Sequence, residues 1–207
     1  MLEDTPVKKE ITRSKEIHKG FVWDVVSETF MMEPGAEELS RDYVKHPGAV
    51  AVMVLNEDDE VFLVKQYRHP IKAKEWEVPA GLLDVNGEDY LEAIKRELYE
   101  EADMYAEHWK VLVDYYTTPG GNNEAIRIYL AQGISEVPED KRFERFHEEA
   151  DMEFGWFKVE DVVAALLDNK IHNPNLSLGI MTLQHVIANN LFDELREPNA
   201  PFTIHAT

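Results

Sequence analysis

The chain of 207 residues contains no cysteine. This absence excludes disulfide bonds, a catalytic thiolate and a zinc site with cysteine ligands, and it fits a reducing compartment. The sequence also lacks an apolar run long enough to span a membrane, and its first residues, MLEDTPVKKE, lack the apolar stretch of a secretion signal. We therefore expect a cytoplasmic protein without a membrane partner.

Basic residues are scarce, because 21 Lys and Arg stand against 41 Asp and Glu, which gives a formal net charge of −20. A surface of this charge repels phosphate backbones, so we expect no nucleic-acid partner. A small anionic ligand remains possible where metal cations and a few arginines reverse the charge locally. The hydrophobic content of 44% suffices for a core, and the length predicts one domain with an appendage. Disorder is expected only up to about Lys15 and after Arg196.

A small antiparallel sheet is expected near the N-terminus. Residues 21–26 are rich in aromatic and β-branched side chains, which is typical of a strand, and residues 41–44 are its expected partner. The sequence therefore predicts an N-terminal β segment over residues 1–45 and a main domain over residues 46–207.

The main domain shows both strand and helix patterns. Residues 49–55 form a continuous apolar run, and residues 61–67 follow a polar turn, which predicts a hairpin whose first strand is buried on both faces. Further strands are predicted over 111–116, 126–131 and 152–157, and helices over 88–102, 160–169 and from Asn173-Pro174 onward. Because the strands do not alternate regularly with helices, we predict an α+β fold with a mixed sheet between helices.

The predicted helix over residues 88–102 carries an acidic face. Glu97 and Glu101, four residues apart, lie one above the other, and Glu100 borders them. Like charges on one face repel, whereas a divalent cation such as Mg²⁺ or Mn²⁺ binds carboxylates and reverses that cost. Arg96 supports this face from the side. The alternative is a solvated acidic helix with ordinary ion pairs.

The segment around these acids resembles the Nudix box. Glu88, seven intervening residues and then Arg96-Glu97-Leu98-Tyr99-Glu100-Glu101 match the core of that motif position for position. The sequence departs from the motif at two places. Six residues instead of five separate Gly81 from Glu88, which resembles the ADP-ribose pyrophosphatase branch, and Asp103 replaces the closing glycine. Asp tolerates a left-handed conformation better than most residues, so the second departure concerns the helix end more than the metal site.

The resemblance covers about residues 16–190 and implies roles for further residues. Metal ligands would be the backbone carbonyl of Ala80 and the side chains of Glu97, Glu100 and Glu101. The catalytic base would be one of Glu148 and Glu149, with Glu149 preferred. The positions that contact the substrate in the family are Arg41, Arg68, Gly120 and Glu124. Each also has a structural interpretation: the Pro-Gly-Gly segment as a turn, the acidic loop as surface charge, and Arg68 as an ion-pair partner.

As a member of this family, the chain is expected to have a Nudix-type α/β/α sandwich with the small N-terminal sheet attached. It is expected to hydrolyse the pyrophosphate bond of ADP-ribose to AMP and ribose 5-phosphate with Mg²⁺ or Mn²⁺, and to form a homodimer through the N-terminal sheet. Two alternatives stay open. One is hydrolysis of another nucleoside diphosphate derivative, such as GDP-mannose or NADH. The other is a non-catalytic module that senses ADP-ribose, which the complete set of box carboxylates argues against.

Overall fold

The computed structural model describes residues 2–143 and 151–205. The chain forms two compact units, the first from residues 1–47 and 116–124 and the second from residues 48–115 and 125–207. The first unit thus takes in a segment far along the chain, whereas the division predicted from the sequence follows the chain at residue 45. None of the helices in the described part is long and apolar enough to cross a membrane.

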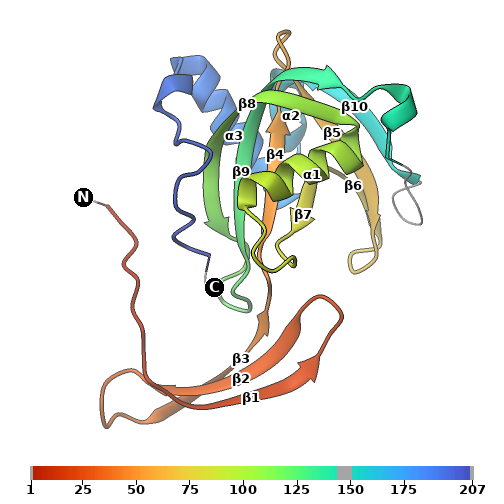
Figure 1. The fold of residues 1–207 in the computed structure, drawn as a ribbon. Helices are drawn as coiled ribbons and strands as arrows, with labels where there is room; N and C mark the ends of the chain where they lie inside the picture. The colour runs from red at the N-terminus through yellow and green to blue at the C-terminus, as the bar shows by residue number, and fades with distance from the viewer. Residues whose placement is uncertain (1, 144–150, 206–207) are drawn as a thin grey trace. The chain divides into compact units, whose positions relative to one another are not determined.

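The first unit contains a three-stranded antiparallel sheet in the order β1-β2-β3 (Figure 1). Its strands are β1 (Ile11–Lys19), β2 (Asp24–Met31) and β3 (Glu38–Lys45). The predicted pairing is confirmed, since Val26 lies opposite Tyr43. Residues 116–124 join this unit through a hydrogen bond from the Val44 amide to the Gly121 carbonyl (3.0 Å).

Two expectations for this sheet were wrong in detail. The strand predicted from Phe21 begins at Asp24, because a turn occupies the preceding residues and the Gly20 amide donates to the Asp24 carboxylate (3.2 Å). The disorder expected up to about Lys15 ends earlier, because β1 begins at Ile11 and pairs with β2 along its length. All nine residues of β1 are exposed, so backbone pairing rather than burial holds it in place.

The second unit contains two sheets. A four-stranded sheet has the order β7-β4-β9-β8, and a three-stranded sheet has the order β10-β5-β6. The strands are β4 (Ala49–Val54), β5 (Glu60–Arg68), β6 (Ala73–Glu77), β7 (Ala80–Leu82), β8 (Met104–Tyr116), β9 (Ala125–Glu136) and β10 (Glu153–Lys158). The strand β4 runs parallel to β9 and antiparallel to β7, so the predicted mixed sheet is confirmed.

The predicted hairpin of residues 49–55 with residues 61–67 was wrong. The turn between them is tight, because the Asn56 side chain accepts hydrogen bonds from the amides of Asp58 and Glu60 (both 2.9 Å). The two strands nevertheless enter different sheets and share only an isolated bridge between Leu55 and Val61. Along β4, β9 pairs with all six residues on one edge and β7 pairs with Ala49–Ala51 on the other, so β4 joins their sheet and not that of β5.

Helices cover both faces of the sheet around β4, which is buried along its whole length (Figure 1). Val50, Val52 and Val54 pack with α1 (Tyr90–Ala102). The alternate β4 residues pack with α2 (Val159–Leu167) and α3 (Pro174–Asn189). Because successive strand residues face opposite sides, β4 belongs to two cores at once. The predicted α+β sandwich is therefore confirmed.

Candidate active site

The helix α1 is closed at both ends by local interactions. At its start, the Asp89 side chain accepts hydrogen bonds from the amides of Leu91 (2.9 Å) and Glu92 (3.3 Å). At its end, Asp103 has a φ of 51°, the left-handed conformation that the closing position of the motif requires. Asp103 therefore takes the place of the closing glycine of the motif, and the helix still extends to Ala102.

The acidic residues Glu97 and Glu101 lie against the backbone of β7. A Cβ atom at Gly81 would come within 2.1 Å of the Glu97 carboxyl carbon, so only glycine permits this approach. One turn further along, the buried Glu101 carboxylate accepts a hydrogen bond from the Ala80 amide (3.0 Å). The helix therefore presents one carboxylate to Ala80, whose carbonyl is a predicted metal ligand, and a second to the adjacent Gly81.

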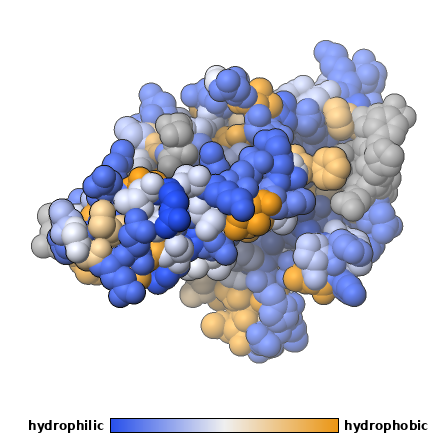
Figure 2. Space-filling model, turned by 90° about the horizontal axis from the view of Figure 1, so that it is seen from below, coloured by the Kyte–Doolittle hydropathy of each residue, from blue (hydrophilic) through white to orange (hydrophobic). Residues whose placement is uncertain are grey.

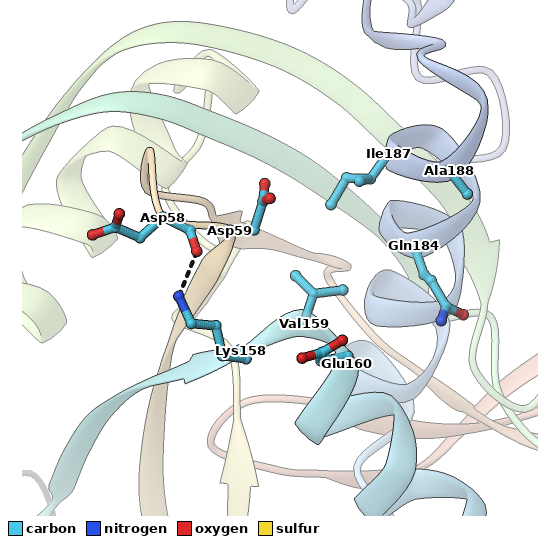
Figure 3. A pocket seen from close by; sticks show the side chains of 8 residues that line it. All are labelled: Asp58, Asp59, Lys158, Val159, Glu160, Gln184, Ile187 and Ala188. Carbon is cyan, nitrogen blue, oxygen red and sulfur yellow. Dashed lines mark hydrogen bonds between the residues drawn. The ribbon is translucent and has the colours of Figure 1, made fainter.

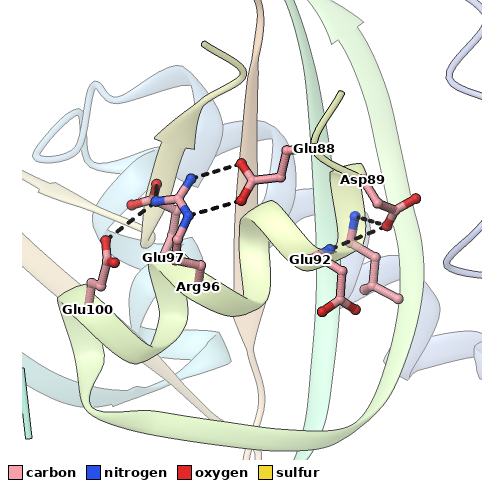
Figure 4. Close-up of polar contacts among 7 residues, drawn as sticks. Glu88, Asp89, Glu92, Arg96, Glu97 and Glu100 are labelled. Atoms are coloured by element: carbon pink, nitrogen blue, oxygen red, sulfur yellow. Dashed lines mark hydrogen bonds and ion pairs between the residues drawn. The ribbon is translucent and has the colours of Figure 1, made fainter. Parts of the chain in front are cut away.

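Arg96 lies between three of the carboxylates on this face (Figure 4). Its Nε and Nη2 donate to the two oxygens of Glu88 (3.1 and 3.0 Å), and its Nη1 donates to Glu97 (2.7 Å) and Glu100 (3.4 Å). The hydrogen bonds that Arg96 donates to Glu88 lower the pKa of Glu88, and the same bonds, with the charge of Glu97, raise the pKa of Arg96. This charge network holds Glu97 in a fixed orientation.

The donors on this face fit a hard divalent cation. They are all oxygens, and they come from neighbouring turns of one helix and from the strand beside it, which suits Mg²⁺ or Mn²⁺. Among the described residues, no three acidic or histidine side chains are gathered around one point as a finished metal site. In this arrangement Arg96 balances the charges of Glu97 and Glu100.

Arg68 is paired with a buried acid in the strand β6. Its Nε and Nη2 donate to both oxygens of Glu77 (2.8 and 2.7 Å), which is 1% exposed. The hydrogen bonds to Glu77 are the main cause of a raised Arg68 pKa, and the charge of Glu101 also contributes. Arg68 thus forms the ion pair that the sequence analysis gave as the alternative to a substrate contact. It also holds a positive charge near the acidic face. Its role toward substrate stays a prediction.

Three predicted substrate contacts belong to the first unit. The Glu124 carboxylate accepts a hydrogen bond from Thr117 (2.7 Å) and lies 3.4 Å from His46. Burial lowers the pKa of His46 against the opposing effect of Glu124, which favours the neutral ring at pH 7. Gly120 lies in the turn before Glu124, and the exposed Arg41 donates to the Ser40 carbonyl (2.8 Å). Their roles toward substrate stay predictions.

The predicted catalytic bases, Glu148 and Glu149, lie outside the described residues.

The second unit also has a cleft of about 310 Å³ between the turn at Asp58 and Asp59 and the helices α2 and α3 (Figure 3). Lys158 lies at this cleft and donates to the Asp58 carbonyl (2.7 Å). None of the predicted site residues that the structure describes lines this cleft, so it is separate from the acidic face of α1.

A family model of the NUDIX domain matches residues 45–177 of this sequence, which includes α1 and β7. The chain belongs to the NUDIX domain family. The predicted family is thereby confirmed, and the close approach of Gly81 to Glu97 is a feature of its NUDIX domain.

Relatives of this NUDIX protein match it over most of its length. An ADP-ribose pyrophosphatase of Mycobacterium tuberculosis (strain ATCC 25618 / H37Rv) is 38% identical over 177 residues, which is 86% of this chain and 84% of the relative. An ADP-ribose pyrophosphatase of Bacillus subtilis (strain 168) is 31% identical over 183 residues, 88% of this chain and 94% of the relative. The crystal structure of an ADP compounds hydrolase is similar in fold, with a TM-score of 0.71, 19% sequence identity and coverage of 91% of this chain and 98% of that one.

Two buried charged residues of the NUDIX domain were missed by the sequence analysis. Glu77, the partner of Arg68, lies between Trp76 and Val78, where strand alternation would predict an outward-facing position although the residue is buried. Arg127 in β9 is fully buried within a segment that was interpreted only as a strand. A charged residue within an apolar strand run was the available signal, because a charge is rarely buried unless it is paired.

Proposed function

We propose that this NUDIX protein hydrolyses the pyrophosphate bond of ADP-ribose to AMP and ribose 5-phosphate with Mg²⁺ or Mn²⁺. The observation that carries this proposal is the placement of Glu97 and Glu101 against the backbone of Ala80 and Gly81. It is supported by a relative named ADP-ribose pyrophosphatase that is 38% identical over 86% of the chain.

In the proposed site, Glu97, Glu100, Glu101 and the Ala80 carbonyl hold the cation. When bound, a divalent cation withdraws charge from the pyrophosphate oxygens and lowers the pKa of water. Arg96 orients Glu97 through the 2.7 Å hydrogen bond and is itself anchored by Glu88. Arg68, oriented by Glu77, adds a fixed positive charge that attracts the anionic substrate.

The attacking water requires a general base, and we assign that role to Glu149 or Glu148. The carboxylate accepts a proton from water as the water oxygen attacks one phosphorus, and the bridging P–O bond breaks so that AMP and ribose 5-phosphate separate. For the first unit we propose that Arg41, Gly120 and Glu124 contact the nucleotide and the terminal ribose. The Glu124 carboxylate can accept hydrogen bonds from sugar hydroxyls, because the Thr117 hydroxyl fixes its orientation (2.7 Å).

A homodimer formed through the first unit is part of the proposal. The turn before β2 exposes Phe21 and Trp23, and β1 exposes Ile11 and Ile17. A twofold contact would bury such side chains on both subunits at once. The face shown in Figure 2 is largely hydrophilic with scattered hydrophobic residues. The cytoplasmic location stays a prediction.

Incubation with a substrate panel tests the proposed activity. ADP-ribose, GDP-mannose, NADH and ATP are each mixed with the protein and Mg²⁺ or Mn²⁺, and the products are identified by mass spectrometry. We expect AMP and ribose 5-phosphate, with the highest kcat/KM for ADP-ribose and no product in the presence of EDTA. A higher kcat/KM for GDP-mannose or ATP would contradict the assigned substrate. Binding of ADP-ribose without any product would identify a sensing module instead.

A further inference from the structure

The segment that follows α3 extends over the sheet of the second unit to the start of α1. The Arg196 carbonyl accepts a hydrogen bond from the Val111 amide in β8 (2.9 Å), and the Pro198 carbonyl accepts one from the Tyr129 hydroxyl in β9 (3.3 Å). We call residues 196–205 the C-terminal strap. It lies outside residues 45–177, which the NUDIX family model matches.

Arg127 fixes the middle of the strap from within the sheet. Its Nη1 donates to the Ala200 carbonyl (2.6 Å) and its Nη2 to the Pro201 carbonyl (2.9 Å). The same guanidinium forms two hydrogen bonds with Asp114 in β8 (2.8 and 2.9 Å), and its side chain is fully buried. A buried cation with this many partners fixes the strap backbone in one conformation.

Beyond this anchor, Phe202 and His205 of the strap contact the first residue of α1. The Phe202 ring is 6% exposed and meets the Tyr90 ring edge to face, with 5.4 Å between ring centroids. The His205 ring stacks on Phe202 (5.3 Å), and its Nδ1 lies 3.1 Å from the Tyr90 hydroxyl. The guanidinium of Arg127 lies 4.6 Å from the Phe202 ring centroid, so the anchor and the contact form one cluster.

The strap also abuts the strand that leads away from Gly48. A Cβ atom at Gly48 would lie 2.6 Å from the His205 ring, and the φ of Gly48 is +88°. Both the close approach and the left-handed backbone therefore favour glycine at this position. The Gly48 carbonyl accepts a hydrogen bond from the Leu83 amide (3.1 Å), directly after β7. His205 therefore contacts the start of α1 directly and is linked to the end of β7 through Gly48.

The start of α1 determines where its carboxylates lie. The helix has 13 residues, a length at which an isolated helix is marginal, so its placement depends on tertiary contacts. Glu88, which anchors Arg96, is two residues before Tyr90, and Glu97 is about two turns after it. A displacement at Tyr90 moves Glu88 and Arg96, and with them the hydrogen bond that orients Glu97.

We propose that the C-terminal strap, with Phe202 as its positioning residue, sets the placement of α1 and thereby the affinity of the acidic face for its divalent cation. The proposal rests on the proposed function only in assuming that Glu97 and Glu101 bind this cation. Phe202 acts through Tyr90, since its hydrocarbon ring offers no ligand atom to a metal.

Mn²⁺ binding, followed by electron paramagnetic resonance of the free ion, tests the proposal without substrate. We expect Phe202→Ala to weaken Mn²⁺ binding about tenfold, as is typical when a supporting contact of a metal site is lost. Phe202→Leu, which keeps most of the buried apolar volume, restores most of the affinity. Val186→Ala is the matched control, because it removes buried apolar volume in the core on the other side of β4. It should leave the affinity within about twofold of wild type.

Hydrogen exchange provides the second readout and covers the case in which Phe202→Ala does not fold. His205→Ala, at a half-buried position, is expected to speed exchange of the first turn of α1 and to weaken Mn²⁺ binding about threefold. Wild-type affinity in both strap variants, or an equal loss in Val186→Ala, would overturn the proposal. A wild-type protein that binds Mn²⁺ but does not cleave ADP-ribose would overturn the proposed function alone. A wild type that binds no Mn²⁺ would overturn both.

Discussion

In the second unit the strand β4 is buried along its whole length, whereas the strand β1 of the first unit is exposed along its whole length. Two hydrophobic clusters fill the faces of β4, but among residues 2–47 and 116–124 the one buried side chain is the polar Thr29. The second unit therefore has a core of its own. The first is held by backbone pairing and polar contacts, which are insufficient for independent stability.

The difference shows that the two units obtain their order in different ways. The second unit holds the candidate site on a framework that packing makes rigid, as in the approach of Gly81 to Glu97. The first unit leaves apolar side chains such as Phe21 and Trp23 in contact with solvent. Such a surface favours association, which the homodimer of the proposed function would satisfy.

Deletion of residues 1–45 tests this comparison with the largest expected effect. The second unit keeps both hydrophobic clusters, so its circular dichroism and cooperative unfolding should persist. We expect a monomeric or aggregating protein whose kcat/KM falls roughly a hundredfold, because the proposed contacts from Arg41 are lost. Light scattering and turnover measure the two effects. A wild-type protein that is monomeric at micromolar concentration and fully active would contradict this expectation.

The substitutions Glu97→Gln and Glu101→Gln test the chemistry of the second unit while leaving its core intact. A neutral amide is a weaker metal ligand of nearly the same shape, so each change should lower kcat by about two orders of magnitude. The melting temperature should stay near that of wild type, since removing one of several like charges costs little. The exposed Glu92→Gln, on the same helix, is the matched control. Near-normal turnover in both variants at saturating Mg²⁺ would show that these acids are surface charge.

A pair of apolar truncations compares the two units directly. Leu183 in α3 is fully buried, so Leu183→Ala should lower the free energy of unfolding by about 3 kcal/mol at every protein concentration. Phe21 is fully exposed, so Phe21→Ser should change it by less than about 0.5 kcal/mol once dilution has separated any dimer. Urea unfolding at two protein concentrations distinguishes the cases. An equal loss for both variants would mean that the first unit has a core after all.

A smaller effect than the loss of the buried Leu183 side chain is expected for the ion pair between Glu88 and Arg96. Its hydrogen bonds lower the pKa of Glu88 below the ordinary value of 4.5, so the pair stabilises the fold above that pH and loses its effect as pH falls through the lowered pKa. Glu88→Gln should cost about 1 kcal/mol near neutral pH, since the pair is partly exposed. The difference from wild type should shrink as the pH falls below 4.5. A difference that does not change with pH would rule out this charge pair as the cause.

The sequence predicts best where the causes of structure are local. The helix α1 ends at Ala102 as expected, and α3 begins at Pro174 after the cap Asn173, because periodicity and capping depend on neighbouring residues. The acidic face followed from the helical spacing of Glu97 and Glu101 in the same way. These features carry most of the candidate site.

Features that depend on distant pairing were not predictable in this way. The expected hairpin of β4 with β5 was wrong, because the choice of strand partner depends on β7 and β9 rather than on the turn. The strand β1 has no alternating apolar pattern, so its nine exposed residues gave no signal. Arg127 finds its partners in Asp114 and in the strap, and no local pattern connects them.

The pairing of β4 has a consequence for the folding of the protein during its synthesis on the ribosome. Ala49 pairs with Ile126 and Val54 with Ala131, so β4 is complete in sequence long before its parallel partner has been synthesised. Until then an uncharged strand, AVAVMV, is without one edge partner, and such segments bind chaperones or aggregate. Substitutions that slow the formation of β9 should therefore reduce the yield of protein in the cell, even where the purified enzyme is unchanged.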